Sequence, residues 1–313
     1  MPTRDAAMAG QILKEQGVVA LGKRVHSKLT RHNDFSPHTP RNFALETAIT
    51  PLNVPHSNNP RWSLIIPVYE QHLLTFTCLK SIADTCASRD IEVIVIDDCS
   101  PTAASDALQA VSGVIFVRNE TNLGFLKNCN KAAATAKGEF VVILNNDLIL
   151  TGDWLEQMTS VFDRFDHTGM VGAKLIYPDG KLQEAGGIVW RDGSAWNVGR
   201  GDDPDKPAYS YVREADYCSG ACLMLKRDFW NELGGFDEAY APAYYEDTDL
   251  AFRVRQKGRR VMYQPHAVVV HFEGQSSGTD TSKGVKQYQV VNQKTFFQRW
   301  ESVLKKHRVN GLS

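Results

Sequence analysis

Acidic residues stand at three places in this sequence where they could carry out chemistry. Asp97 and Asp98 end one hydrophobic segment, and Asp147 follows another. In open α/β sheets ligands bind beyond the carboxyl ends of the strands, so these acids lie where a nucleotide would bind. Glu246 and Asp247 come directly before an apolar helix start. A carboxylate at such a loop-to-helix junction can act as a base toward a substrate hydroxyl.

The segments that must position these acids alternate between strand and helix patterns. The predicted strands are 64–68, 93–96, 114–117 and 140–144. Helices are predicted at 73–85 and 127–136, and a closing helix is predicted at 287–306. A further helix is predicted to begin after Ser100, which would be its N-cap. This alternation indicates a parallel sheet that is covered by helices on both faces. Beyond about residue 150 the strands become irregular and glycine-rich, which predicts a mixed sheet with long loops.

An ordered set of motifs is the most specific feature of the chain. In sequence order they are Ile65-Ile66-Pro67-Val68-Tyr69, Asp97-Asp98, Asn145-Asn146-Asp147, Gly234-Gly235-Phe236-Asp237-Glu238, Glu246-Asp247 and His271-Phe272-Glu273-Gly274. This combination resembles the family 2 glycosyltransferases of the GT-A fold, over about residues 62–300. The resemblance implies an α/β, Rossmann-like GT-A fold, in which a central, mostly parallel sheet is flanked by helices.

Residue patterns at the ends of the chain, together with the resemblance between them, divide the chain into four parts. Residues 1–60 form an N-terminal extension, with a basic amphipathic helix at 8–31 and a proline-rich linker or extended wrap after it. Residues 61–170 and 171–280 are the nucleotide-sugar-binding half and the acceptor and catalytic half of the GT-A domain. Residues 281–313 are a C-terminal helical segment.

The resemblance also assigns residues to the nucleotide and the donor sugar. The nucleotide and donor set is Pro67, Tyr69, Glu70, Asp97, Asp98, Gly124, Lys127, Asn146 and Asp147. In this set Tyr69 stacks on the base and Asp98 contacts it. An alternative is that Asp97 and Asp98 support the turn before the Ser100 helix. Lys127 could likewise be a solvated surface lysine.

The resemblance further implies a divalent cation, Mn²⁺ or Mg²⁺. Asn145-Asn146-Asp147 stands where the family has its D-x-D motif, and Asp147 and His271 are the implied metal ligands. One carboxylate can suffice, because Mg²⁺ commonly binds one or two carboxylates together with phosphates and waters. Asn145 departs from the family pattern, so weak metal binding or metal independence remains an alternative.

Asp247 is the implied general base, and Glu246 helps to shape the site beside it. A structural alternative is that Asp247 caps a helix at 248–257. The implied residues at the donor sugar and the acceptor are Ser219, Gly220, Ala221, Gly235, Phe236, Asp249 and Trp196. The predicted reaction is a single displacement with inversion, from a UDP- or dTDP-sugar to a hydroxyl of a glycan or a lipid-linked glycan. Alternatives are a retaining transferase, a sugar nucleotidyltransferase and an inactive glycan-binding domain.

Composition and charge limit the partners and the location. The formal net charge is −1, so nothing in the overall charge favours nucleic acid as a partner. The cysteines form no C-x-x-C pair and no apolar stretch is long enough to span a bilayer, which predicts reduced cysteines and a cytoplasmic location. For the helix at 8–31 we expect packing against the rest of the chain or a neighbouring subunit. The alternatives for residues 1–60 are a peripheral contact at the inner face of the membrane and a further transferase domain.

Overall fold

The first half of the fold is a set of parallel strands, as the apolar segments predict. The computed structural model describes residues 43–274 and 287–310. Its strands in this half are β1 (Leu52–Asn53), β2 (Trp62–Val68), β3 (Ile91–Asp97), β4 (Val111–Ser112), β5 (Val114–Arg118) and β6 (Phe140–Leu144). Strands β5, β3, β2 and β6 lie side by side in this order, and all their pairings are parallel. Their carboxyl ends therefore meet at one edge of the sheet.

The second half makes the sheet mixed, as its irregular pattern predicts. Its strands are β7 (Leu148–Leu150), β8 (Thr168–Ile176), β9 (Leu182–Glu184), β10 (Gly187–Val189), β11 (Ala195–Asn197), β12 (Arg213–Glu214), β13 (Cys222–Lys226) and β14 (Arg260–His271). Strand β13 lies antiparallel between β6 and β8, and β14 runs parallel to β8. Strands β10 and β11 form a separate antiparallel hairpin.

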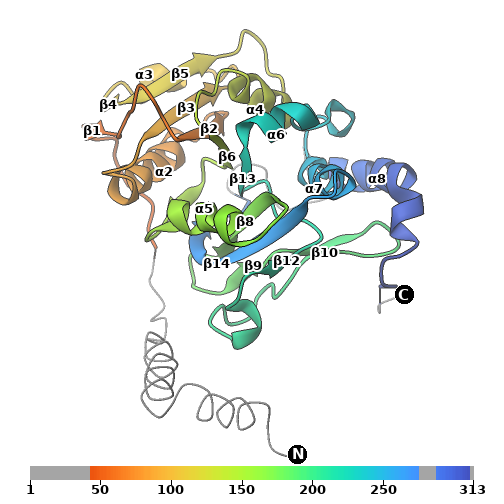
Figure 1. Ribbon diagram of the computed structural model, residues 1–313. Coiled ribbons are helices and arrows are strands. Elements are labelled where there is room, and N and C mark those ends of the chain that lie inside the picture. The colour runs from red at the N-terminus through yellow and green to blue at the C-terminus, as the bar shows by residue number, and fades with distance from the viewer. Residues whose placement is uncertain (1–42, 275–286, 311–313) are drawn as a thin grey trace, which may run out of the picture. The chain divides into compact units, whose positions relative to one another are not determined.

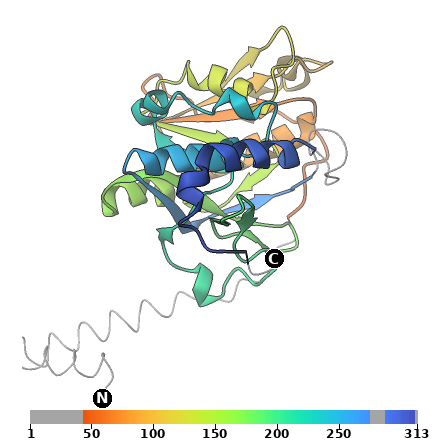
Figure 2. The ribbon, with the colours of Figure 1, turned by 90° about the vertical axis from the view of Figure 1, so that its right-hand side faces the viewer.

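Helices cover both faces of the main sheet (Figure 1). They are α2 (His72–Thr85), α3 (Ala104–Ala107), α4 (Phe125–Ala133), α5 (Trp154–Arg164), α6 (Arg227–Leu233), α7 (Glu246–Gln256) and α8 (Tyr288–Leu304), with short 3₁₀ turns at Pro207–Tyr209 and Glu238–Tyr240. Helices α2 and α5 pack on one face, where Phe76 and Trp154 join the larger apolar core. Helices α4, α6, α7 and α8 pack on the other face (Figure 2).

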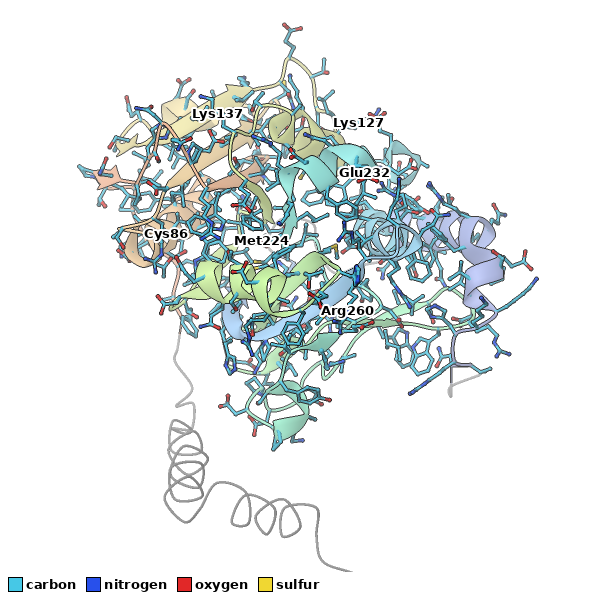
Figure 3. All side chains as sticks on the ribbon, viewed as in Figure 1. Cys86, Lys127, Lys137, Met224, Glu232 and Arg260 are labelled. Atoms are coloured by element: carbon cyan, nitrogen blue, oxygen red, sulfur yellow. The ribbon has the colours of Figure 1, made fainter. Side chains whose placement is uncertain are left out.

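Side chains of the sheet interior are closely packed. Met224 of β13 is fully buried between the sheet and α5, whereas Lys127, Glu232 and Arg260 lie on the outside (Figure 3). All the cysteines in the described residues are free thiols, as expected. Within residues 43–274 and 287–310, no helix combines the length and the apolar character needed to cross a membrane.

Two expectations about boundaries are corrected. The helix expected from Ser100 is the short α3, which begins at Ala104, because the Ser100 hydroxyl instead accepts a hydrogen bond from the Glu70 N–H at 2.8 Å. The division at about residue 60 is also shifted, because β1 pairs with β4 and Val54 is buried in the larger core. The described residues all belong to one compact unit. The helix predicted at 8–31 lies outside the described residues.

Candidate functional site

A cavity of about 590 Å³ opens at the carboxyl edge of β2, β3 and β6, and the start of α7 closes its opposite wall. A volume of this size is typical of small-molecule sites. The structure brings many of the predicted residues to this one cavity. Those in its lining are Pro67, Tyr69, Asp98, Gly124, Asn146, Asp147, Ser219, Gly220, Ala221, Glu246, Asp247 and His271.

The nucleotide end of the cavity is formed by the turn after β2 and the loop before α4. Tyr69 is 49% exposed at this wall, so its ring is available for stacking. The Asp98 carboxylate accepts hydrogen bonds from the backbone N–H groups of Leu123 and Gly124, both at 2.8 Å. Gly124 has φ +80, a conformation that L side chains rarely adopt, and it lies against Pro242. Asp98 therefore fixes the shape of this loop at the cavity wall.

Asp97 and Asp98 are adjacent, but only Asp98 lines the cavity. Asp97 accepts hydrogen bonds from the backbone N–H groups of Ser100 and Ala104 and is paired with Arg118 at 2.5 Å. Burial raises the pKa of Asp97, but these donors outweigh it and hold the pKa below its ordinary value. These contacts match the alternative that Asp97 supports the turn before α3. They do not support the predicted contact between Asp97 and the nucleotide sugar.

The residues in the place of the D-x-D motif fit a divalent cation. Asp147 is 4% exposed, and its Oδ1 accepts no hydrogen bond from the described residues. This oxygen lies 3.2 Å from His271 Nε2. The other ring nitrogen of His271 contacts the Gln183 side-chain amide at 3.0 Å, which holds the ring in place. One carboxylate oxygen and one imidazole nitrogen thus converge, with ligand types that suit Mn²⁺ or Mg²⁺ when a phosphate completes the shell.

Asn145 occupies the place of the first acid of the D-x-D motif, and its contacts are with the protein. Its Nδ2 lies 3.4 Å from His271 Nε2. The neighbouring Asn146 donates from Nδ2 to Thr75 Oγ1 at 3.1 Å and lines the cavity. Among the described residues there is no cluster of three or more His, Cys, Asp or Glu side chains that could hold a metal ion. A cation held by Asp147 and His271 would complete its shell with phosphate or water oxygens.

Asp247 faces the cavity from the opposite wall. Its Oδ2 accepts from the Gly220 N–H at 2.9 Å, and its Oδ1 accepts from the Thr248 N–H at 2.6 Å. Burial raises the pKa of Asp247, while these donors oppose the rise. Burial also raises the pKa of Glu246 well above its ordinary value, and the charge of Asp247 adds to this. Glu246 Oε2 accepts no hydrogen bond from the described residues, whereas both Asp247 oxygens accept backbone N–H groups, so these contacts favour the negative charge on Asp247 over Glu246.

The structural alternative for Asp247 is corrected. Helix α7 begins at Glu246, and its N-cap position is Tyr245, which makes no side-chain capping bond. Asp247 therefore lies in the first turn of α7 and not at the N-cap position. The helix dipole stabilises a negative charge in this turn. Tyr244 and Tyr245 precede it with φ values of 75 and 70. The strand-to-helix pattern does not predict this left-handed backbone.

Other predicted residues lie outside the cavity lining, and these are Glu70, Asp97, Lys127, Gly235, Phe236, Asp249 and Trp196. Lys127 pairs with Glu238 at 3.1 Å on the surface. Asp249 is fully buried and pairs with Arg253 at 2.7 Å. These two contacts are structural, so a direct role of Lys127 or Asp249 at the donor is not supported.

Gly235, Phe236 and Trp196, also outside the lining, make packing contacts. Gly235 lies against Asn130, and Phe236 packs on Phe125 and Trp230. Trp196 is 39% exposed and packs edge-on against Trp190.

Several polar residues near the site are not among the predicted ones. Gln183, Asn197 and Glu273 line the cavity, and Glu184 lies directly behind it. Glu184 Oε1 accepts from the Ser219 N–H at 2.9 Å and so supports the turn that holds Asp247. These residues come from short strands and strand ends with no apolar alternation. Only Glu273, within the predicted His271-Phe272-Glu273-Gly274 motif, had a signal in the sequence.

Glu184 makes the free energy of unfolding depend on pH. Burial raises the pKa of Glu184 from 4.5 to about 8. Between these values the folded chain keeps a proton that the unfolded chain has lost, so stability falls as pH rises, by up to about 1.4 kcal/mol per pH unit. We expect Glu184→Gln to flatten this slope in urea unfolding measured across the same pH window. The exposed Glu120→Gln should leave the slope unchanged, and equal slopes for both variants would contradict the assignment.

The family model described as Glycosyl transferase family 2 matches residues 63–233. Relatives have similar sequences. The chain is 30% identical over 237 residues to the uncharacterized protein y4gI of Sinorhizobium fredii, covering 72% of the chain and 26% of that protein. It is 28% identical over 238 residues to the O-antigen biosynthesis protein RfbC of Myxococcus xanthus, covering 73% and 18%. The chain therefore spans about a quarter of the first relative and less than a fifth of the second.

A third relative has a more similar length. The N-acetylglucosaminyl-diphospho-decaprenol L-rhamnosyltransferase of Mycobacterium tuberculosis is 26% identical over 236 residues, which is 67% of this chain and 74% of that protein.

Solved structures share the fold. A structure of GalNAc-T7 with UDP, GalNAc and Mn²⁺ matches with a TM-score of 0.60 and 16% identity, over 78% of this chain and 49% of that one. A mannosyltransferase from Pyrobaculum calidifontis with GDP-Man and Mn²⁺ matches with a TM-score of 0.53 and 18% identity, over 86% and 69%. The family model covers more than half of the chain, and the chain therefore belongs to glycosyl transferase family 2, with a GT-A fold.

Proposed function

We propose that this chain is an inverting glycosyltransferase that moves a sugar from a nucleoside-diphosphate sugar to an acceptor hydroxyl. One observation carries the proposal: Asp247 faces the same cavity that Tyr69, Asp98 and Asp147 line from the opposite side. A donor held at the strand edge would present its sugar toward Asp247. The acceptor hydroxyl would then enter between the sugar and this carboxylate.

In the proposed reaction Asp247 accepts the proton of the acceptor hydroxyl as the new glycosidic bond forms. Its hydrogen bonds from Gly220 and Thr248 fix the carboxylate, and the raised pKa of Glu246 beside it favours the protonated form, which can donate to a sugar oxygen. General-base help of this kind contributes about 10²-fold to 10⁴-fold in rate. The diphosphate leaves from the opposite side of the sugar, which inverts the anomeric carbon.

The charge of the cavity supports metal assistance. Among the described residues its lining includes the carboxylates of Asp98, Asp147, Asp247 and Glu273, but no lysine or arginine. A donor diphosphate would bring further negative charge into this acidic surface. Asp147 and His271 would hold the divalent cation, which when bound neutralises the diphosphate and assists its departure.

Removal of the Asp147 carboxylate should abolish metal-dependent donor binding. In a thermal-shift screen of UDP, dTDP, GDP and their sugars, we expect one nucleotide to raise the Tm with Mn²⁺ or Mg²⁺ and not with chelator. Binding at 100 times Kd stabilises the folded state by about 2.7 kcal/mol. Asp147→Ala should lose this shift, and the exposed Asp106→Ala should keep it. A full shift in chelator would refute the metal role.

We further propose that the donor is a UDP- or dTDP-sugar and that the acceptor is a glycan or a lipid-linked glycan. Two relatives support the acceptor type: the O-antigen biosynthesis protein RfbC and the N-acetylglucosaminyl-diphospho-decaprenol L-rhamnosyltransferase. The functional test is transfer of a labelled sugar, followed by assignment of the product anomer by NMR. An inverted anomer supports the proposal, and a retained anomer rejects the single displacement. The cytoplasmic location and the role of residues 1–60 stay predictions.

A further inference from the structure

Helix α8 contacts the loop that leads to Asp247 through one buried amide. Asn292 is 3% exposed. Its Nδ2 lies 2.7 Å from the carbonyl oxygen of Tyr240, and 2.9 Å from those of Ala243 and Tyr244. Only the NH₂ end of an asparagine can donate to carbonyl oxygens, so these three acceptors fix the orientation of the side chain. One side chain thus joins both ends of the loop.

This loop needs support from outside. Tyr244 and Tyr245 both have positive φ, at 75 and 70, although neither is glycine. Such residues cost about 1–3 kcal/mol each and persist where the surroundings hold them. Ala243, Tyr244 and Tyr245 also line the cavity, and Glu246 and Asp247 follow directly. The conformation of the loop therefore sets where the first turn of α7 places its carboxylates.

Two further residues on the same face of α8 reinforce this contact. Phe296, one turn after Asn292, packs its ring 5.3 Å from that of Tyr245. Trp300, a further turn on, donates from Nε1 to Asp249 Oδ1 at 2.8 Å. Figures 1 and 2 show α7 and α8 side by side on one face of the sheet. The helix thus contacts the loop and α7 at successive turns.

We propose that Asn292 is a positioning residue that holds the 240–245 loop in the conformation that places Asp247 for catalysis. The effect on turnover rests on the proposed function, because it requires Asp247 to be the base. The loop contact itself does not. Asn292 lies outside the cavity lining and touches neither the nucleotide wall nor the residues that would hold a cation.

The test compares Asn292→Ala with Gln298→Ala, which removes an exposed amide from the same helix. Displacement of a catalytic group by about 1 Å can lower the rate by about 10²-fold. We therefore expect kcat of Asn292→Ala to fall by about 10²-fold while the donor KM stays at the wild-type value. Asn292→Ser keeps one donor and should give an intermediate loss. Gln298→Ala should match the wild type.

Hydrogen–deuterium exchange of the 240–248 amides tests the loop contact of Asn292 separately from the proposed transferase function. Faster exchange in Asn292→Ala than in Gln298→Ala, together with the fall in kcat, supports the proposal. Unchanged exchange, or faster exchange with normal kcat, overturns it. If the wild-type protein transfers no sugar at all, the proposed function fails, and the exchange alone then decides whether Asn292 holds the loop.

Discussion

Asp247→Asn should lower kcat by about 10²-fold to 10⁴-fold, because the amide cannot accept the proton of the acceptor hydroxyl. Both Asp247 oxygens accept hydrogen bonds from backbone N–H groups, at Gly220 and at Thr248. The amide NH₂ would face one of these donors, so the variant also loses one of the bonds that fix the side chain. Initial rates of sugar transfer at saturating donor measure the effect.

The control for this variant is Asp228→Asn. Asp228 also lies in the first turn of a helix, α6, and its side chain is 91% exposed. The Asp228→Asn variant removes the same charge from a matching helix position outside the cavity lining, and this variant should keep wild-type turnover. Nucleotide-induced Tm shifts should persist in Asp247→Asn, since Tyr69 and Asp98 are untouched. Turnover near the wild-type value would end the assignment of Asp247 as the base.

The first half of the fold could be predicted from the sequence because its central strands β2, β3 and β6 are buried on both faces. The strand at 140–144 was predicted with its observed ends. Strands β2 and β3 extend further than predicted, to Trp62 and Ile91. The extra residues include Ser63 and Glu92, which are buried and hydrogen-bonded to each other. A polar pair of this kind interrupts an apolar pattern without interrupting a strand.

The sequence predicts which segments form the site. It does not predict as well which side chains of these segments face the cavity. Asp97 and Asp98 have the same chemistry, but Asp97 bonds to the turn before α3 and Asp98 to the loop before α4. The choice depends on Arg118, which lies 21 residues away along the chain. Local spacing does not contain this information. Glu184 was missed for a related reason, because its contact with Ser219 forms only when distant strands pair.

The resemblance assigns Asp249 to the sugar site, whereas the structure buries it in the protein. We therefore expect its replacement to have a large effect on stability. Asp249 is 0% exposed and Arg253, its partner at 2.7 Å, has a side chain that is only 11% exposed. Asp249→Ala would leave this guanidinium buried without its carboxylate. Breaking a buried pair by removing one partner costs about 3–5 kcal/mol. The free energy of unfolding in urea should fall by this amount.

Asp249→Ala also tests the earlier assignment of Asp249 to the sugar site. Asp249 Oδ1 accepts from Tyr240 at 3.1 Å and from Trp300 at 2.8 Å, so its loss would loosen the 240–245 loop and α8 together. The exposed Asp228→Ala should change stability by no more than about 0.5 kcal/mol. Unchanged stability of Asp249→Ala with a weakened donor affinity would instead place Asp249 at the sugar. The contacts predict the opposite, because every bond of this carboxylate that the structure shows is made inside the protein.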